Sequence, residues 1–382
     1  MPKLLYLISE DWFFCSHFIE RAIAAKQAGY EVIVVARETD HGAIIRNAGL
    51  RLIPLKVERR RINPLGELQT LLDIWRIYRN ERPDLLHHIA LKPMLYGSFI
   101  ARILGLSHLV NAPVGMGYIF TSDKWIARLL RPFVLSAIRR LINPSCSKVV
   151  FENNDDLTNF VADGLVRSSD AVLIRGAGVN IDQFTPQPEP KDPPVVVLTA
   201  RMLWDKGVGE FVEAARQLRL KGINARFLLV GAPDLGNPAT ISNKQLQAWH
   251  KDGVIEWIGH QNDIAAILAS SHIVCLPSYR EGLPKSLIEA LAAGKPVVTT
   301  DVPGCREVVR NGANGILVPP RNVHALVEAL SQMLTNPKLR AQFGARGRAR
   351  AETEFASHLI IKLTLSLYQE LLSKQIGYVD AS

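Results

Sequence analysis

Cysteine is scarce in this sequence, and long apolar runs are missing. The four cysteines, at positions 15, 146, 275 and 305, form no CxxC pair and lack metal-ligand spacing, so we interpret them as reduced and mostly buried. No apolar segment reaches the roughly 18 residues that a membrane-spanning helix requires. The short apolar start is followed at once by Ser9, Glu10 and Asp11, which favours a buried strand over a signal peptide. We therefore expect a cytoplasmic protein.

Signatures of two other protein classes are also missing. A dinucleotide oxidoreductase would place GxGxxG after its first strand, and Ser9–Ser16 contains no glycine. The net charge of +9 permits nucleic-acid binding, but no helix-turn-helix, zinc or aromatic-basic signature accompanies it. We expect no nucleic-acid partner. The basic balance also suits phosphorylated ligands or an anionic membrane surface.

Short apolar runs alternate with amphipathic stretches along the chain. A helix is predicted over Ser16–Gln27, with Gly29 suited to its cap. Alternation of strands and helices predicts parallel sheets built from βαβ units. The predicted strands are Leu4–Ile8, Glu31–Val35, Leu52–Leu55, Leu85–His88, Leu109–Asn111, Lys148–Phe151, Val195–Thr199, Phe227–Val230, Val254–Trp257, Ile273–Leu276 and Pro296–Thr300.

A proline-rich segment separates the two series of strands. Thr185–Pro194 holds five prolines in ten residues, which predicts a semi-rigid linker. We therefore expect an α/β fold of two doubly wound domains, residues 1–185 and 186–355, with a cleft between them. Residues 356–382 are predicted to form a helix that packs across both domains.

The strongest chemical signal is a pair of glutamates around the start of a predicted helix. Glu281 follows the strand Ile273–Leu276, Pro284 suits the first helical position, and Glu289 lies about a turn and a half further on. N–H groups at a helix start bind anions such as a diphosphate. A carboxylate on each side suits the hydroxyls of a sugar and of a ribose. The alternative is that both glutamates are ordinary solvated residues.

A second signal is the basic pair Arg201 and Lys206, which follows the strand Val195–Thr199. In an open α/β sheet, ligands bind outside the carboxyl ends of the strands. Positive charges at that edge would stabilise a leaving diphosphate, and such electrostatic help is often the largest catalytic contribution. The alternative is a pair of surface charges.

Together these motifs resemble those of the retaining family 4 glycosyltransferases of the GT-B fold. The resemblance implies that Glu281 contacts the donor sugar, that Glu289 binds the ribose hydroxyls, and that Arg201 and Lys206 bind the diphosphate. It also places the backbone of Gly282, Leu283 and Pro284 near the sugar and phosphates, and Ile258 and Gly259 near the base. The matching positions are Arg201-x4-Lys206-Gly207, Gly231, Val254-x3-Ile258-Gly259, Leu276-Pro-Ser278, Glu281-x7-Glu289 and Gly294-x-Pro296-Val.

The N-terminal half is similar to transferases that build capsule, O-antigen and related lipid-linked oligosaccharides. The resemblance makes Lys92, His17 and Gly115 candidates for acceptor binding. Two departures stand out: Ser9–Trp12 lacks the Gly-Gly pair of many members, and Val114 stands where many have histidine. The segments that carry this likeness are Trp12–His17, Ala28–Val32, His87–Gly97 and Gly115–Phe120.

Histidines and lysines in this half also have plain structural interpretations. His17 suits a place on the first helix without any functional role. His87 and His88 end a predicted buried strand, and at least one of them is expected to be structural. The catalytic role that the family histidine has cannot be carried over to either one.

Residues 124–140 form a basic segment with many apolar residues between the charges. Such a helix can lie on an anionic membrane surface, and Arg59–Arg61 would extend its charge. The alternative is a core helix with a solvated basic rim. Pro132 is predicted to kink or divide it. The basic residues are Lys124, Arg128, Arg131, Arg139 and Arg140.

The function that these patterns indicate is sugar transfer. We expect a glycosyltransferase that moves a sugar from a nucleotide sugar, most simply UDP-linked, to a polyprenyl-diphosphate-linked saccharide with retention. No cofactor and no catalytic metal are expected, and the place of action is the inner face of the cytoplasmic membrane. The alternative is a UDP-sugar 2-epimerase of the same fold, which would need further carboxylates and histidines that the sequence does not clearly supply.

Overall fold

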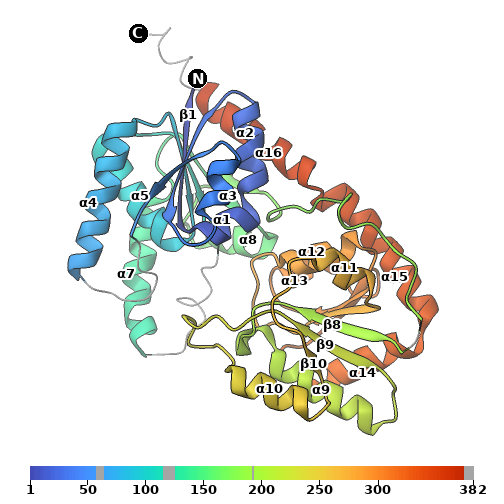
Figure 1. Cartoon of the computed structure of the whole chain (residues 1–382). Coiled ribbons are helices and arrows are strands. Elements are labelled where there is room, and N and C mark those ends of the chain that lie inside the picture. The colour runs from blue at the N-terminus through green and yellow to red at the C-terminus, as the bar shows by residue number, and fades with distance from the viewer. Residues whose placement is uncertain (57–63, 115–124, 192, 374–382) are drawn as a thin grey trace. The chain divides into compact units, whose positions relative to one another are not determined.

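The chain folds into two compact units (Figure 1). The computed structural model describes residues 1–382 apart from 57–63, 115–124, 192 and 374–382, and apart from the side chains of 125–128 and 130. One unit comprises Met1–Ala177 and His358–Ser382, and the other comprises Gly178–Ser357. The chain therefore passes from one unit to the other twice.

The N-terminal unit has, within the described residues, a seven-stranded parallel sheet of order β3-β2-β1-β4-β5-β6-β7. The strands are β1 (Lys3–Glu10), β2 (Glu31–Arg37), β3 (Arg51–Pro54), β4 (Leu85–Ile89), β5 (Leu109–Ala112), β6 (Ser147–Phe151) and β7 (Ala171–Leu173). The helices are α1 (Asp11–His17), α2 (Ile19–Gln27), α3 (Gly42–Asn47), α4 (Pro64–Glu81), α5 (Leu91–Leu104), α7 (Trp125–Leu141), α8 (Asn154–Ala162) and α16 (Ser357–Ser373).

The central strand β1 is apolar on both faces because helices cover both sides of the sheet. Successive side chains alternate between faces, so Leu4 and Tyr6 pack into one core and Leu5 and Leu7 into the other. The first core is closed by α2, α3 and α16, and the second by α4 and α5 (Figure 1).

The C-terminal helix α16 is part of the core of the N-terminal unit. Its Tyr368 hydroxyl lies 2.9 Å from the Tyr6 hydroxyl on β1 and 2.6 Å from His87 Nδ1 on β4. All three side chains are buried, so these hydrogen bonds replace the water that each polar atom loses on folding. Burial also raises the pKa of Tyr6 to about 12, which keeps its hydroxyl protonated. The helix is thus tied to the two central strands of the sheet.

The C-terminal unit has, in the described part of the chain, a six-stranded parallel sheet of order β10-β9-β8-β11-β12-β13. The strand order reverses between β8 and β11, which makes their carboxyl ends the topological switch point. The strands are β8 (Val195–Thr199), β9 (Arg226–Val230), β10 (Glu256–Trp257), β11 (Ile273–Leu276), β12 (Val297–Thr300) and β13 (Gly315–Val318). The helices are α9 (Val208–Leu220), α10 (Asn243–Lys251), α11 (Ile264–Ala269), α12 (Lys285–Ala292), α13 (Cys305–Val308), α14 (Val323–Thr335) and α15 (Pro337–Arg350).

Two parallel, doubly wound sheets confirm the predicted fold class. The first predicted helix is divided at Phe18 into α1 and α2, and Ser9–Trp12 is not a loop, because β1 runs to Glu10 and α1 starts at Asp11. The strands β7 and β13 were not predicted. The helix α7 runs through Pro132 as one element, so this proline does not divide it.

The proline-rich segment packs on the C-terminal unit. The guanidinium of Arg340 donates to both carboxylate oxygens of Glu189 at 2.8 Å, and His272 Nε2 lies 3.1 Å from the Pro190 carbonyl oxygen. The compact units divide between residues 177 and 178, upstream of this segment. Among the described helices, none is both long and apolar enough to cross a membrane.

Replacing Tyr368 with phenylalanine is expected to lower the free energy of unfolding of the N-terminal unit by about 1–3 kcal/mol, because buried polar atoms lose their partner. Urea denaturation of the full chain measures the loss. Tyr96→Phe is the matched control: its hydroxyl donates to Glu67 Oε2 at 2.7 Å in a partly exposed place, where water can replace it, so its loss should be the smaller of the two. Equal losses in the two variants would contradict the role assigned to Tyr368.

Candidate active site

The loops that follow β8 and β11 lie against each other at the switch point. Gly207 has a φ of +70°, and a Cβ added there would lie 2.1 Å from the Pro277 carbonyl oxygen. Across the same contact, the Tyr279 amide donates to the Asp205 carbonyl oxygen at 2.9 Å, and Ser278 Oγ donates to it at 3.1 Å. Only glycine combines this backbone conformation with so close an approach. The two loops therefore hold each other in place.

An ion pair joins the same two loops. Lys206 Nζ donates to Glu281 Oε1 at 2.5 Å, and the side chains are only 20% and 10% exposed. A charge-assisted hydrogen bond in so sheltered a place is stronger than a surface ion pair. The structure thus brings two of the predicted catalytic residues into direct contact at the carboxyl edge of the sheet.

Arg201 lies at the start of the loop after β8 and has an acidic neighbour. Its Nη1 donates to Asp234 Oδ2 at 2.7 Å, while its side chain stays 41% exposed. Asp234 belongs to the loop after β9, and sequence reasoning did not identify it. At such exposure the ion pair is weak, so the guanidinium keeps access to a ligand.

Glu289 lies in the second turn of α12, in a mostly buried place. Burial raises the pKa of its carboxyl, and Lys285, whose Nζ lies 3.7 Å from Glu289 Oε1, opposes that shift. A carboxylate with one exposed side and one cation nearby can accept hydrogen bonds from hydroxyl groups. This fits the chemistry predicted for it.

The segment from Gly282 to Pro284 connects Glu281 with α12. Pro284 is the residue before the helix, so the first helical residue is Lys285, one position later than predicted. The loop after β12 approaches this segment closely, because a Cβ on Gly304, whose φ is +78°, would lie 2.4 Å from the Gly282 carbonyl oxygen. Leu283 is buried beneath it. Steric contact from the loop after β12 therefore helps to hold this backbone in place.

The candidates Ile258 and Gly259 follow β10. Gly259 has a φ of +71°, and its carbonyl oxygen accepts from the Gly231 amide at 2.7 Å. A Cβ on Gly231 would lie 1.8 Å from the Ala200 carbonyl oxygen, so the loops after β8, β9 and β10 are in contact. Ile258 keeps 37% of its surface exposed. The C-terminal candidates therefore gather at one edge of one sheet, on its loops and, for Glu289, on α12.

The candidates in the N-terminal unit are more scattered. Lys92 Nζ donates to Glu67 Oε1 at 2.7 Å, so its charge is already paired with α4. The ring of His17 lies 4.2 Å from that of Phe13, and its carbonyl oxygen accepts from Arg21 Nη2 at 2.8 Å. Gly115 lies outside the described residues.

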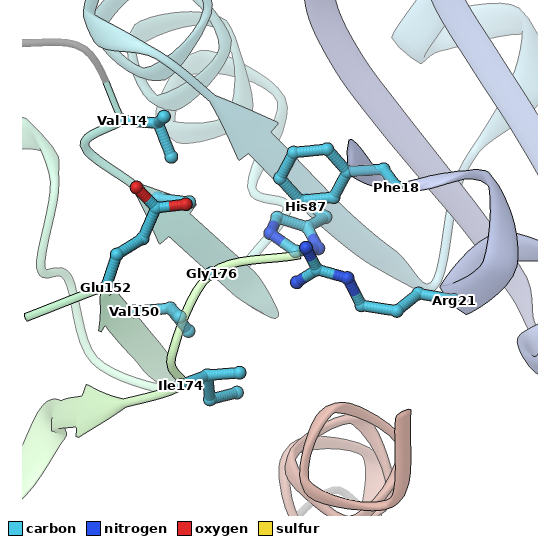
Figure 2. Close-up of a pocket in the computed structure, with 9 residues that line it drawn as sticks. Phe18, Arg21, His87, Val114, Val150, Glu152, Ile174 and Gly176 are labelled. Atoms are coloured by element: carbon cyan, nitrogen blue, oxygen red, sulfur yellow. The ribbon is translucent and has the colours of Figure 1, made fainter. Parts of the chain in front are cut away.

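The two adjacent histidines of β4 have different surroundings. His88 lies in a buried network, with Tyr78 OH 2.9 Å from its Nε2 and Asn111 Oδ1 2.8 Å from its Nδ1. Burial lowers the pKa of His88 to about 4. His87 instead lines a pocket that also contains Val114 (Figure 2). The pocket contains two charged residues that sequence reasoning missed, Arg21 and Glu152, of which only Glu152 had a signal, because it directly follows β6.

Solved structures with the same arrangement identify the fold. The chain superimposes on a glycosyltransferase from Rickettsia africae (TM-score 0.74, 20% identity, 97% of this chain and 98% of that one). It also superimposes on Anabaena Alr3699/HepE, solved in complex with UDP and glucose (TM-score 0.79, 17% identity, 97% and 100%). The fold is therefore GT-B.

Family models and curated relatives agree with the fold. Residues 3–145 match the model "Glycosyl transferase 4-like", and residues 180–350 match "Glycosyl transferases group 1". The two models together cover most of the chain, so it belongs to the glycosyltransferases that combine a 4-like N-terminal domain with a group 1 C-terminal domain. It is 28% identical, over 91% of its length and 93% of the relative's, to N,N'-diacetylbacillosaminyl-diphospho-undecaprenol α-1,3-N-acetylgalactosaminyltransferase from Campylobacter jejuni. It is 24% identical to the capsular polysaccharide biosynthesis glycosyltransferase CapM of Staphylococcus aureus, over 85% and 86%.

Gly207→Ala is expected to destabilise the C-terminal unit far more than Gly222→Ala. Both glycines have positive φ, at +70° and +77°, but an added Cβ meets the Pro277 carbonyl oxygen only at position 207 and finds open space at 222. In each variant, the strained backbone conformation should lower the free energy of unfolding by about 1–2 kcal/mol. In Gly207→Ala, overpacking should lower it by about 2 kcal/mol more. Thermal unfolding of both variants measures the difference; indistinguishable midpoints would show that the loop contact is dispensable.

Proposed function

We propose that this enzyme transfers a hexose or N-acetylhexosamine from a UDP-linked donor to a polyprenyl-diphosphate-linked saccharide, with retention, in cell-surface polysaccharide synthesis. The observation that carries the proposal is the Lys206–Glu281 pair at the switch point between β8 and β11. Open α/β sheets bind their ligands at that place. A cation beside a carboxylate there suits a ligand with both a diphosphate and sugar hydroxyls.

The acceptor class is supported by the names of two relatives. The Campylobacter jejuni relative is named for a diphospho-undecaprenol-linked sugar. A second relative, from Escherichia coli, is UDP-Gal:α-D-GlcNAc-diphosphoundecaprenol α-1,3-galactosyltransferase, 24% identical over 71% of both chains. That second name also supports UDP as the nucleotide.

In the proposed reaction, the bond between the sugar's anomeric carbon and the diphosphate breaks, and the acceptor hydroxyl oxygen forms the new bond on the same face. The proton of that hydroxyl passes to the leaving diphosphate. Arg201, Lys206 and the N-terminus of α12 stabilise the diphosphate as negative charge develops on it. Glu281 orients the donor sugar and keeps the Lys206 ammonium fixed in one direction. Glu289 binds the ribose hydroxyls, and Ile258 and Gly259 contact the base.

The proposal assigns the acceptor to the N-terminal unit. Lys92, His17 and Gly115 are the candidate contacts there. Lys92 shares its charge with Glu67, so an acceptor phosphate bound by it competes with that carboxylate or is bound beside it. An ammonium donates three hydrogen bonds, so one partner does not exhaust it.

Nucleotide release from a panel of UDP-, GDP- and ADP-sugars tests the proposal, with and without a short polyprenyl-diphosphate saccharide. The wild type should release one nucleotide only when acceptor is present. Glu281→Gln and Arg201→Met should each reduce kcat/KM by about 100-fold or more, as removal of a transition-state contact does. Arg226→Met is the control, because Arg226 pairs with Glu256 on exposed surface. Release that ignores both site substitutions would contradict the proposed roles.

We further propose that the enzyme works on the inner face of the cytoplasmic membrane, with α7 in contact with anionic lipid. Leu129 and Phe133 lie four residues apart on this helix and are 60% and 69% exposed. Arg139 and Arg140 are exposed on its last turn. Lys124 and the side chain of Arg128 lie outside what the structure describes. An apolar stripe with basic neighbours suits a lipid surface.

The neighbouring helices also carry exposed apolar side chains. The helix α5 contacts both α4 and α7, and Figure 1 shows these three helices on one side of the N-terminal unit. On α4 and α5, large apolar side chains face solvent, which is unusual for several adjacent helices of one unit. They are Leu65, Leu68, Leu72, Phe99 and Ile103.

The double variant Leu129→Ser/Phe133→Ser is expected to bind phosphatidylglycerol vesicles at least tenfold more weakly than the wild type. Transfer of the two side chains from water to lipid supplies roughly 3 kcal/mol or more. Vesicle cosedimentation measures the change. Leu220→Ser/Leu235→Ser removes two leucines that are each 87% exposed in the other unit, and this control should bind like the wild type. Similar loss in both doubles would place the contact elsewhere.

A further inference from the structure

We infer that the pocket formed by Arg21, His87 and Glu152 binds one hydroxyl group of the acceptor saccharide. Figure 2 shows the Arg21 guanidinium beside the His87 imidazole, with the Glu152 side chain entering from the opposite side. All residues that line the pocket belong to the N-terminal unit. The inference rests on the proposed function and adds where the saccharide itself is recognised.

Two buried polar atoms of this pocket lack a hydrogen-bond partner among the described residues. Arg21 and His87 are 5% and 2% exposed, and within the described residues Arg21 Nε and His87 Nε2 have no hydrogen-bond partner. Buried polar atoms are almost always satisfied, by protein, water or a bound molecule. Two such atoms in one pocket mark it as a binding site.

Both side chains are fixed in place by their other contacts. Arg21 Nη2 donates to the His17 carbonyl oxygen at 2.8 Å, and the guanidinium stacks over the Phe18 ring at 4.2 Å. His87 Nδ1 is held by Tyr368 OH at 2.6 Å. Each residue therefore presents its remaining polar atom without losing side-chain freedom on binding, which favours affinity.

The size of the pocket selects a small group. Its cavity measures about 10 Å³, which is about the least that can hold a single water molecule. A hydroxyl group is the part of a saccharide that fits this volume. A whole phosphate, with its additional oxygens, does not fit.

The charges also favour a neutral hydroxyl over a phosphate. Arg21 is positive and interacts electrostatically with Glu152, so their charges offset each other. Burial, with Arg21 adding to it, lowers the pKa of His87 well below its ordinary value, so the imidazole is neutral. Arg21 Nε can only donate and a carboxylate can only accept, whereas a hydroxyl does both. A phosphate would meet the carboxylate of Glu152.

The remaining walls are apolar and suit the carbon that carries a sugar hydroxyl. They come from Phe18, Ala112, Val114, Val150, Ile174 and Gly176. The pocket lies where strands end, because Ala112 closes β5, Glu152 follows β6 and Ile174 follows β7. Few polar groups among apolar walls are typical of small-molecule sites, and this edge of the sheet is where such sites form.

A binding cycle with deoxygenated acceptors tests the inference. Calorimetry without donor measures the Kd of the short polyprenyl-diphosphate saccharide used in the nucleotide-release assay, and of its monodeoxy analogues. One analogue should bind the wild type at least tenfold more weakly, because a charge-assisted hydrogen bond is lost. Arg21→Met should weaken binding of the parent saccharide by a similar factor. This variant should bind the deoxy analogue no more weakly than it binds the parent saccharide. Arg51→Met, which removes an exposed ion pair with Glu81, is the matched control.

A second variant covers the case in which Arg21→Met fails to fold. Val114→Phe fills the half-buried rim of the pocket and keeps every polar group. This variant should bind the saccharide at least tenfold more weakly than the wild type. The inference is overturned if the analogue penalty persists unchanged in both variants, or if donor KM rises while acceptor Kd does not, which would give the pocket to the donor sugar. Absence of nucleotide release in the wild type would contradict the proposed function instead. Saccharide binding is then still measured, and its absence overturns the pocket assignment as well.

Discussion

The close backbone contact between the loops after β8 and β11 is the constraint on which the candidate active site depends. A glycine at position 207 allows the chain to turn within van der Waals distance of the Pro277 carbonyl group, and no side chain intervenes. The contact between the loops places the side chains of Lys206 and Glu281 within hydrogen-bond distance of each other. The ion pair is therefore a consequence of the backbone geometry. The charge distribution at the switch point is fixed before any ligand arrives, which is the property called preorganisation.

The two units use buried charge in different ways. In the C-terminal unit, a cation and an anion touch, and both keep one side open to solvent. In the N-terminal unit, Arg21 lies almost fully buried against an aromatic ring and beside a neutral imidazole. The first arrangement leaves an ammonium partly open to solvent, where it can reach a diphosphate. In the second, Glu152 offsets the charge of Arg21, and the remaining hydrogen-bonding capacity suits a sugar. The proposed assignment of donor and acceptor to the two units thus has an electrostatic basis.

Much of the fold and of the C-terminal candidate site was predictable from sequence, and the same reasons explain why some strands and ion pairs were not. Strands buried on both faces are continuous apolar runs, so β8 and β11 were predicted with correct bounds, and the residues after them had to meet at one edge. The strand β7 is three residues long and only half-buried, and such a segment carries no clear pattern. Asp234 and Glu67 pair with residues 33 and 25 positions away, and nothing local encodes those pairs. Arg21 was missed because a charged residue on an amphipathic helix is normally placed on the solvent side.

The position of Tyr368 has a consequence for how the protein is made. Tyr6 and His87 belong to the first quarter of the chain, yet their hydrogen-bond partner is 362 and 281 residues further along. During synthesis, the N-terminal sheet emerges first, and part of one apolar face stays uncovered until the whole second unit has been translated. Its helix α16 can pack only after the whole second unit has left the ribosome. The N-terminal unit is therefore first in sequence but is completed only after the second unit, and this order leaves part of its core open to solvent in the meantime.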